Sequence, residues 1–313
     1  MTELKVHPEL AQTVRFIPTL PFHRTWFVKV VQSLQRIWPS AKGAEGITID
    51  TCALSNASIR VYQPTGVHCG AALLWMHGGG LVSGRAAQDD TLCSAYAREL
   101  GLIVVSVDYR LAPAQPFPAA LNDCHEAWQW LVASADRFGI DPARIALSGQ
   151  SAGGGLAASL AQRLTDEGDG TPACVALFCP MLDDRTSTNM ALDPLNHKIW
   201  NNRSNRACWS AYLQQSPGGA QVAPYAVPAR REDLSGLPKT WIGIGDIDLF
   251  YQECLAYAQR LCQFDVECSL YVVSGAPHAF ETIAPRAQVT RKLFAANFRF
   301  LQQSLGLPTV ERE

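Results

Sequence analysis

The stretch Arg144-Ile-Ala-Leu-Ser-Gly149-Gln-Ser151-Ala-Gly153 decides the fold class. It begins as an apolar, strand-like run, turns at a serine between two glycines, and continues as the Ala/Leu-rich segment Gly154-Gly-Leu-Ala-Ala-Ser-Leu160. G-x-S-x-G between a strand and a helix is typical of a nucleophilic serine on a strained turn. The glycines let chain segments pass without a Cβ clash, and the helix N-terminus favours a developing oxyanion. Because the pattern also occurs by chance, a plain tight turn is the alternative interpretation.

Short β-rich runs alternate with helical patterns along the rest of the chain. The strand-like runs from residue 71 onward are nearly continuous apolar segments, as expected for parallel strands covered on both faces. In the two runs before them, apolar and polar residues alternate, as in an antiparallel hairpin. Helical periodicity follows Ser151 and recurs between the other runs. The pattern predicts an α/β fold with a mostly parallel, eight-stranded, doubly wound sheet. The expected strands are 47–51, 59–63, 71–76, 102–108, 144–148, 174–179, 240–244 and 269–273.

Composition excludes several classes of protein. Of the 313 residues, 48% are hydrophobic and 17% charged, and the net charge is −2, which excludes charge-driven disorder and argues against a nucleic-acid partner. The N-terminus lacks a basic start followed by an apolar run, and the charge-free stretch 61–84 is broken by proline and glycines, so no membrane span is expected. Ten cysteines without C-x-x-C or zinc spacing predict reduced thiols, a cytoplasmic location and no metal.

Two segments do not fit the strand–helix alternation. Residues 1–45 contain an amphipathic stretch, and about 183–236 interrupts the strand rhythm inside a catalytic domain of residues 46–313. We expect both segments to form a helical cap over the carboxyl edge of the sheet, where open α/β folds bind ligands. The alternative is that they pack as ordinary core helices. The apolar residues behind this prediction are Phe27, Val30, Val31, Leu34 and Trp38, and Trp200, Trp209 and Tyr212.

A glycine run, His77-Gly78-Gly79-Gly80, follows the third expected strand. No G-K-[ST] follows it and the chain has no G-x-G-x-x-G, so a nucleotide site is excluded. The run fits an oxyanion loop, in which the N–H groups of Gly79 and Gly80 act with that of Ala152. His77 and Gly78 are expected to support this loop. His77 is less suited to be the base, because in this topology the base follows the acid along the chain.

The remaining members of a catalytic triad are therefore expected late in the chain. Of the two histidines after Ser151, His278 follows a strand-like run, whereas His197 lies in a polar part of the expected cap. Either Asp246 or Asp248, both directly after the strand 240–244, could orient that histidine and stabilise its protonated form. Their i, i+2 spacing on a turn means that only one can serve.

Together these motifs resemble the hormone-sensitive-lipase-like family of α/β-hydrolase esterases. The resemblance covers about residue 45 to the C-terminus, with a family-like cap before it. It implies Ser151 as nucleophile, His278 as base and Asp248 as acid, since the family's aspartate stands five residues before a glutamate, here Glu253. It rests on His77-Gly-Gly-Gly80, Asp108-Tyr-Arg-Leu-Ala-Pro113, Phe117-Pro-Ala-Ala120, Gly149-Gln-Ser-Ala-Gly-Gly154 and Pro277-His278.

The chain departs from the family pattern at several places, one of them Ala114-Gln115, where the family often has Glu after the Tyr-Arg-Leu-Ala-Pro run. Gln150 stands where the family usually has Asp or Thr, Leu81 where aromatic residues are common, and Leu249 begins Leu-Phe-Tyr-Gln in place of Pro-Leu-Arg-Asp. These three residues are candidates for the lining of the substrate pocket.

The activity that follows from these residues is acyl transfer through Ser151 without a cofactor. We expect hydrolysis by water of small-molecule esters with short to medium acyl chains. The same triad could instead cleave lactones, thioesters or amides, or transfer the acyl group to an alcohol. A non-catalytic small-molecule receptor is the alternative from another class, which the presence of all three triad residues disfavours. The resemblance allows a homodimer, and no feature of the chain itself indicates an interface.

Overall fold

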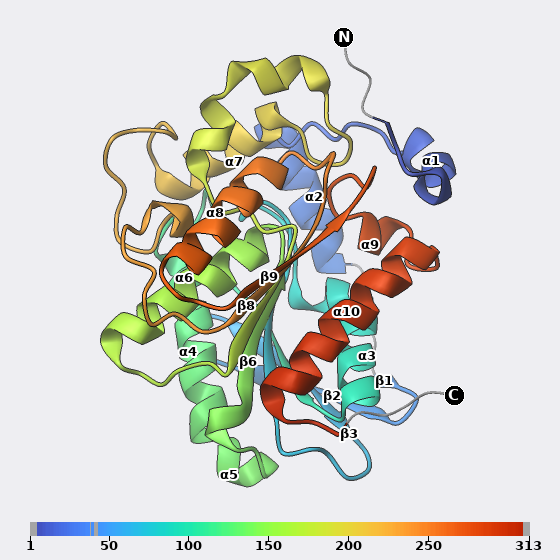
Figure 1. The fold of residues 1–313 in the computed structure, drawn as a ribbon, viewed down its shortest axis with the longest axis vertical. Coiled ribbons are helices and arrows are strands. Elements are labelled where there is room, and N and C mark those ends of the chain that lie inside the picture. Colours follow the sequence, from blue (N-terminus) through green and yellow to red (C-terminus); the bar gives the residue numbers. More distant parts are fainter. Residues whose placement is uncertain (1–4, 38, 41–42, 309–313) are drawn as a thin grey trace.

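A computed structural model describes residues 5–37, 39–40 and 43–308. These residues form a mixed sheet with the strand order β1-β2-β3-β5-β4-β6-β7-β8-β9 (Figure 1). β1, β2, β3 and β5 pair antiparallel in that order, and every pairing from β5·β4 to β8·β9 is parallel. The strands are β1 Gly43–Ala44, β2 Ile47–Ala53, β3 Ser58–Pro64, β4 Ala72–Met76, β5 Ile103–Asp108, β6 Ile145–Gln150, β7 Cys174–Phe178, β8 Thr240–Gly245 and β9 Cys268–Val273.

All eight expected strands are confirmed, and the sheet has a ninth, β1. A two-residue strand is too short to show any alternation of apolar and polar residues, which explains why the sequence does not predict it. β4, β6, β7 and β8 are buried along their whole length, as their largely apolar sequences indicate. β2 is mostly exposed on alternate residues, as expected for the antiparallel end of the sheet.

Helices cover both faces of the sheet and bury two separate clusters of apolar side chains. α3 and α10 pack on one face, and α4, α6 and α8 on the other (Figure 1). This is the doubly wound arrangement predicted from the sequence. The helices are α1 Pro8–Arg15, α2 Thr25–Ile37, α3 Asp90–Leu100, α4 Ala119–Ala133, α5 Ala135–Phe138, α6 Ala152–Glu167, α7 Asn202–Leu213, α8 Tyr251–Gln263, α9 Phe280–Ile283 and α10 Gln288–Leu305.

α2 and α7 lie beyond the carboxyl ends of the parallel strands (Figure 1). The segment before α2 and the segment before α7 meet at Phe22 and Trp200, whose ring centroids are 5.5 Å apart. On α7, the predicted apolar residues Trp209 and Tyr212 are buried. These helices form a cap over the sheet edge, while the division of the chain at 45, 183 and 236 stays a prediction.

The inward face of α2 differs from the sequence prediction. Val30 and Leu34 are 46% and 53% exposed, whereas Val28 is buried. The side chain of Gln32 donates to Val82 O (2.7 Å), and that of Gln35 accepts from Gly84 N (2.9 Å). Phe27 and Val31 of the predicted set are half-buried, whereas the residues of α2 that bind the loop are polar and are not detected by counting apolar residues. Trp38, the last residue of the predicted stripe, lies outside the described residues.

The N-terminal segment is attached to the C-terminal part of the chain. His7 N donates to Gly275 O (2.8 Å), and Glu9 accepts from Gln288 N (2.6 Å). Gly275 has a φ of +70°, and a Cβ there would come within 2.5 Å of His7 N, so the contact requires glycine. The loop that precedes His278 is thus held against residues 5–9.

Two further observations concern the cysteines and the helices. All ten cysteines are free thiols. Within the described ranges, no helix combines the length and the apolar character needed to cross a bilayer.

Candidate active site

Ser151 lies between β6 and α6 in a backbone conformation that side chains rarely adopt, with φ +55° and ψ −118°. The crowding around it explains the two glycines of the motif. A Cβ on Gly149 would overlap the carbonyl group of Gly153, and a Cβ on Gly153 would overlap the carbonyl oxygens of Met76 and His77. The turn therefore holds the serine at the carboxyl end of β6 and at the N-terminus of α6.

The structure brings Ser151, His278 and Asp248 together. His278 Nε2 lies 2.9 Å from Ser151 Oγ, and His278 Nδ1 lies 2.8 Å from Asp248 Oδ2. All three residues are at most 5% exposed. Asp248 accepts a second hydrogen bond, from Phe250 N (2.9 Å), which fixes its carboxylate at the end of β8. Such a chain can move a proton from the serine to the histidine while the carboxylate stabilises the resulting imidazolium.

Asp246, the alternative acid in the sequence, has a different set of partners. Its carboxylate accepts from Ser274 Oγ (2.9 Å) and Gly275 N (2.6 Å). Asp246 therefore stabilises the loop that carries His278. Its carboxylate oxygens bind Ser274 and Gly275 and do not take part in the Ser151–His278–Asp248 hydrogen-bond chain.

The glycine run lies against Ser151. A Cβ on Gly78 would come within 3.5 Å of Ser151 Cβ, and Gly79 and Gly80 adopt φ values of +133° and +64°. Within the described part of the chain, the N–H groups of Gly79, Gly80 and Ala152 donate to no protein acceptor. These donors are thus free to bind an anionic oxygen next to the serine.

His77 lies beneath this loop. Its ring stacks on Tyr109 at 4.1 Å, and its Nδ1 lies 2.8 Å from Gly78 O. Tyr109 Oη donates to His77 O (2.7 Å). Burial lowers the pKa of His77, and the bond to a carbonyl requires a proton on Nδ1. The contacts of His77 are with the loop and with Tyr109, and the hydroxyl of Ser151 donates its hydrogen bond to His278.

The three candidate pocket residues are all buried. Gln150 lies behind the turn, where its amide donates to Glu281 Oε1 and Thr282 Oγ1, both at 2.7 Å. Leu81 and Leu249 are each 3% exposed, and Leu81 has a φ of +65°. Their assignment to the pocket stays a prediction.

Two buried glutamates have contacts that the sequence did not indicate. Burial raises the pKa of Glu281 and, more strongly, that of Glu253. Glu253 accepts from Leu182 N (2.7 Å) and from the hydroxyl of Thr186, and so holds the start of the insertion after β7. In the family pattern, Glu253 serves only to identify Asp248 as the acid. Glu281 comes three residues after His278, and this short separation is the sequence signal that could have placed Glu281 near the site.

The inserted segment covers the glycine run. A Cβ on Gly80 would overlap the indole of Trp200 and lie 3.2 Å from Cys208 Sγ on α7. The ring of Trp200 is 6.4 Å from that of His278. His197 is buried and close enough to Asp248 and His278 for both to influence its pKa, which burial lowers. His197 therefore lies near the site, whereas the sequence had placed it in a polar part of the cap.

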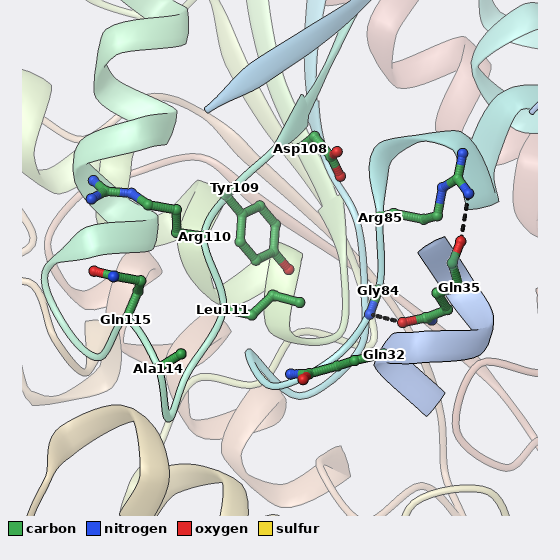
Figure 2. A pocket seen from close by; sticks show the side chains of 10 residues that line it. All are labelled: Gln32, Gln35, Gly84, Arg85, Asp108, Tyr109, Arg110, Leu111, Ala114 and Gln115. Atoms are coloured by element: carbon green, nitrogen blue, oxygen red, sulfur yellow. Dashed lines mark hydrogen bonds between the residues drawn. The ribbon is translucent and has the colours of Figure 1, made fainter. Parts of the chain in front are cut away.

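A cavity of about 550 Å³ lies on the outer side of the glycine loop. Figure 2 shows Gln32 and Gln35 of α2 on one side of it and the segment 108–115 on the other. Ser151, His278 and Asp248 do not line this cavity. It is a surface cavity next to the site, separate from the three residues.

Two groups of side chains in the described residues have the spacing of metal ligands. In one, Cys179 joins Asp248 and His278; in the other, His125 joins Glu167 and Asp169. The Asp248–His278 hydrogen bond explains the first, and contacts of His125 Nε2 with Asp169 and Glu167 at 2.9 and 3.5 Å explain the second.

Comparison with known proteins agrees with this geometry. A family model described as the alpha/beta hydrolase fold matches residues 73–282. The chain belongs to the α/β-hydrolase family. Ethyl acetate hydrolase of Pseudomonas putida is 33% identical over 241 residues, which cover 71% of this chain and 70% of that protein.

Solved structures of this α/β-hydrolase family extend the similarity over nearly the whole chain. A bacterial heroin esterase superposes with a TM-score of 0.86 at 32% identity, covering 97% of this chain and 99% of the other. An esterase from the bacterial hormone-sensitive lipase family superposes with a TM-score of 0.76 at 28% identity, covering 96% and 99%. The family resemblance inferred from the motifs is confirmed.

Proposed function

We propose that this carboxylic ester hydrolase of the α/β-hydrolase family cleaves short- to medium-chain esters through a covalent acyl-enzyme on Ser151. The observation that carries the proposal is the hydrogen-bonded chain from Ser151 Oγ to His278 (2.9 Å) and on to Asp248 (2.8 Å). The relatives named above, including an ethyl acetate hydrolase and a heroin esterase, support ester hydrolysis as the reaction.

In the first step, His278 Nε2 takes the proton of Ser151 and the serine oxygen attacks the ester carbonyl carbon. The N–H groups of Gly79, Gly80 and Ala152 stabilise the oxyanion of the tetrahedral intermediate, helped by the N-terminus of α6. Asp248 keeps the proton of His278 on Nδ1 and stabilises the imidazolium. The intermediate collapses when His278 gives its Nε2 proton to the departing alcohol.

In the second step, water replaces the alcohol. His278 accepts a proton from the water, which attacks the acyl carbon of the acyl-enzyme, and the same N–H groups stabilise the second oxyanion. Collapse releases the carboxylic acid and returns the proton to Ser151. No group outside this chain and the water is needed to balance the reaction.

The preference for short to medium acyl chains is supported by the residues over the site. Trp200 and Cys208 fill the space above Gly80, which leaves little room for a long acyl chain beside the oxyanion donors. A series of p-nitrophenyl esters from acetate to palmitate tests this preference. We expect the highest kcat/KM at eight carbons or fewer, and an optimum at sixteen would overturn it.

Ser151→Ala tests the catalytic assignment. We expect turnover of p-nitrophenyl butyrate to fall by about 10⁴-fold or more, because removing a triad member leaves only binding and oxyanion stabilisation. A fluorophosphonate should label the wild type at Ser151 and leave the variant unlabelled. Undiminished turnover, or labelling at another residue, would falsify the assignment.

A further inference from the structure

The segment that covers the site carries several buried polar groups that lack partners. Among the described residues, neither amide atom of Asn205 is hydrogen-bonded, and Nε1 of Trp200 and Nδ1 of His197 also have no partner. Asn205 is fully buried, and the other two residues are each 5% exposed. A buried polar group without a partner costs stability, so its presence requires an explanation.

These groups belong to the segment that covers the oxyanion loop. Trp200 contacts the Cβ position of Gly80, and Cys208 Sγ lies 3.2 Å from the same point. Asn205 precedes Cys208 by three residues on α7, so the two side chains share one face of the helix. His197 is close enough to Asp248 and His278 for both to influence its pKa, which burial lowers most, so it lies near these two residues.

The backbone that presents two of these residues is strained. Asn196 and Ile199 have φ values of +46° and +71°. Positive φ is unfavourable for a β-branched residue such as isoleucine, and strain of this kind is retained where the surrounding structure depends on it. Asn196 and Ile199 directly precede His197 and Trp200, whose side chains are buried.

The chemistry of the three groups indicates what they could bind. The Asn205 amide offers both a donor and an acceptor, the Trp200 indole offers a donor, and the His197 imidazole offers either one according to its tautomer. A hydroxyl or carbonyl group matches such a neutral set. An alkyl chain would leave the amide unpaired, which is the situation in which binding sites discriminate most strongly.

We infer that His197, Trp200 and Asn205 recognise a hydrogen-bonding substituent of the substrate, so that the preferred esters carry a hydroxyl or carbonyl group close to the scissile bond. This inference rests on the proposed function, because it assigns a substrate class to the same serine site. Asn205 is the specificity-determining residue, since both of its polar atoms depend on the ligand.

Asn205→Leu, which keeps the size of the side chain, tests the inference with two matched substrate pairs. On the acyl side, p-nitrophenyl 3-hydroxybutyrate is compared with p-nitrophenyl 3-methylbutyrate. On the alcohol side, 2-hydroxyethyl butyrate is compared with propyl butyrate. The wild type should prefer the hydroxylated member of one pair, and the kcat/KM ratio of that pair should fall about tenfold in the variant. Differences in intrinsic reactivity cancel in this comparison.

Stability provides the second measurement. Because Asn205→Leu removes an unpaired buried amide, its Tm should rise by about 2 to 4 °C. Thr290→Val is the matched control: Thr290 Oγ1 is also buried without a partner in the described residues, but lies on α10, on the opposite side of the sheet from α6. The Tm of Thr290→Val should rise by a similar amount, and this variant should keep the wild-type selectivity. Asn205→Ala should lose the same selectivity if the leucine variant does not fold.

Unchanged selectivity for both pairs would overturn the inference. A lower Tm in Asn205→Leu, with equal losses on both members of each pair, would also overturn it, by showing that a bound water or the fold itself uses the amide. Either result leaves the proposed function intact, because the alkyl esters are still hydrolysed. Failure of the wild type on all four esters would instead contradict the proposed function.

Discussion

Asp248→Asn should remove most of the turnover, whereas Asp246→Asn should remove little. The 2.8 Å bond from Asp248 Oδ2 to His278 Nδ1 is buried, with side chains 0% and 4% exposed. At a charge separation of about 4 Å and an effective dielectric of 20, the carboxylate stabilises the imidazolium by about 4 kcal/mol, or about a thousandfold in rate. Asparagine also favours the tautomer with its proton on Nε2, which cannot accept the serine proton, and the total loss in kcat should approach 10⁴-fold.

Asp246→Asn is the matched control, two residues away on the same turn. Its new amide can still accept from Gly275 N and can donate to Ser274 Oγ, so the loop keeps both contacts. We expect kcat to stay within about tenfold of the wild type and the free energy of unfolding to fall by about 1 kcal/mol.

The assay is p-nitrophenyl butyrate hydrolysis, with kcat normalised to sites titrated by a fluorophosphonate. This normalisation separates slow chemistry from a loss of folded protein. Equal losses in the two variants, or an Asp248→Asn variant within tenfold of the wild type, would refute the assignment of Asp248 as the acid.

Two further predictions concern polar groups away from the reacting atoms. Burial raises the pKa of Asp89 to about 7, so between pH 5 and pH 7 its carboxyl holds a proton in the folded state that the unfolded chain has lost. Over this range the free energy of unfolding of the wild type should fall by about 2 kcal/mol relative to that of Asp89→Asn. Urea titration at each pH measures this difference. No difference in slope would contradict this shift. Gln150→Leu should lower stability by about 2 kcal/mol, because Glu281 loses its amide donor, and Gln150→Leu/Glu281→Leu should recover much of the loss. Equal Tm values for the single variant and the wild type would show that the bond is not needed.

The sequence predicts the sheet well because buried strands are recognisable by their apolar residues. β4 and β7 are apolar at every position and β6 and β8 at most positions, so their place in the centre of the sheet follows from their composition. The turn at Ser151 is equally recognisable in the sequence, because close contacts with neighbouring backbone require glycine at 149 and 153.

The choice between Asp246 and Asp248 is different. Both residues follow β8 at suitable positions, and only the path of the loop before His278 decides which carboxylate reaches the imidazole. From the residues alone the question stayed open, and family resemblance was needed to favour Asp248.

The cap is the least predictable part of the molecule. Trp200 reaches Gly80 because Ile199 adopts a positive φ, which no local pattern in the sequence indicates. The inward face of α2 escaped prediction for a related reason: Gln32 and Gln35 use their amides to hold the glycine loop, and apolar periodicity does not detect such contacts.

The attachment of residues 5–9 to the C-terminal part of the chain has a consequence for biosynthesis. Ribosomes make residues 5–9 before Gly275 and Gln288, and Glu9 and Gln288 lie 279 residues apart in the sequence. These contacts can therefore form only after β1 to β9 have been made. Because Gly275 belongs to the loop that carries His278, residues 5–9 can support the histidine only from that stage on. Most of the sheet can form before then, whereas the Ser151–His278–Asp248 chain needs residue 278 and is completed only after all nine strands have been made.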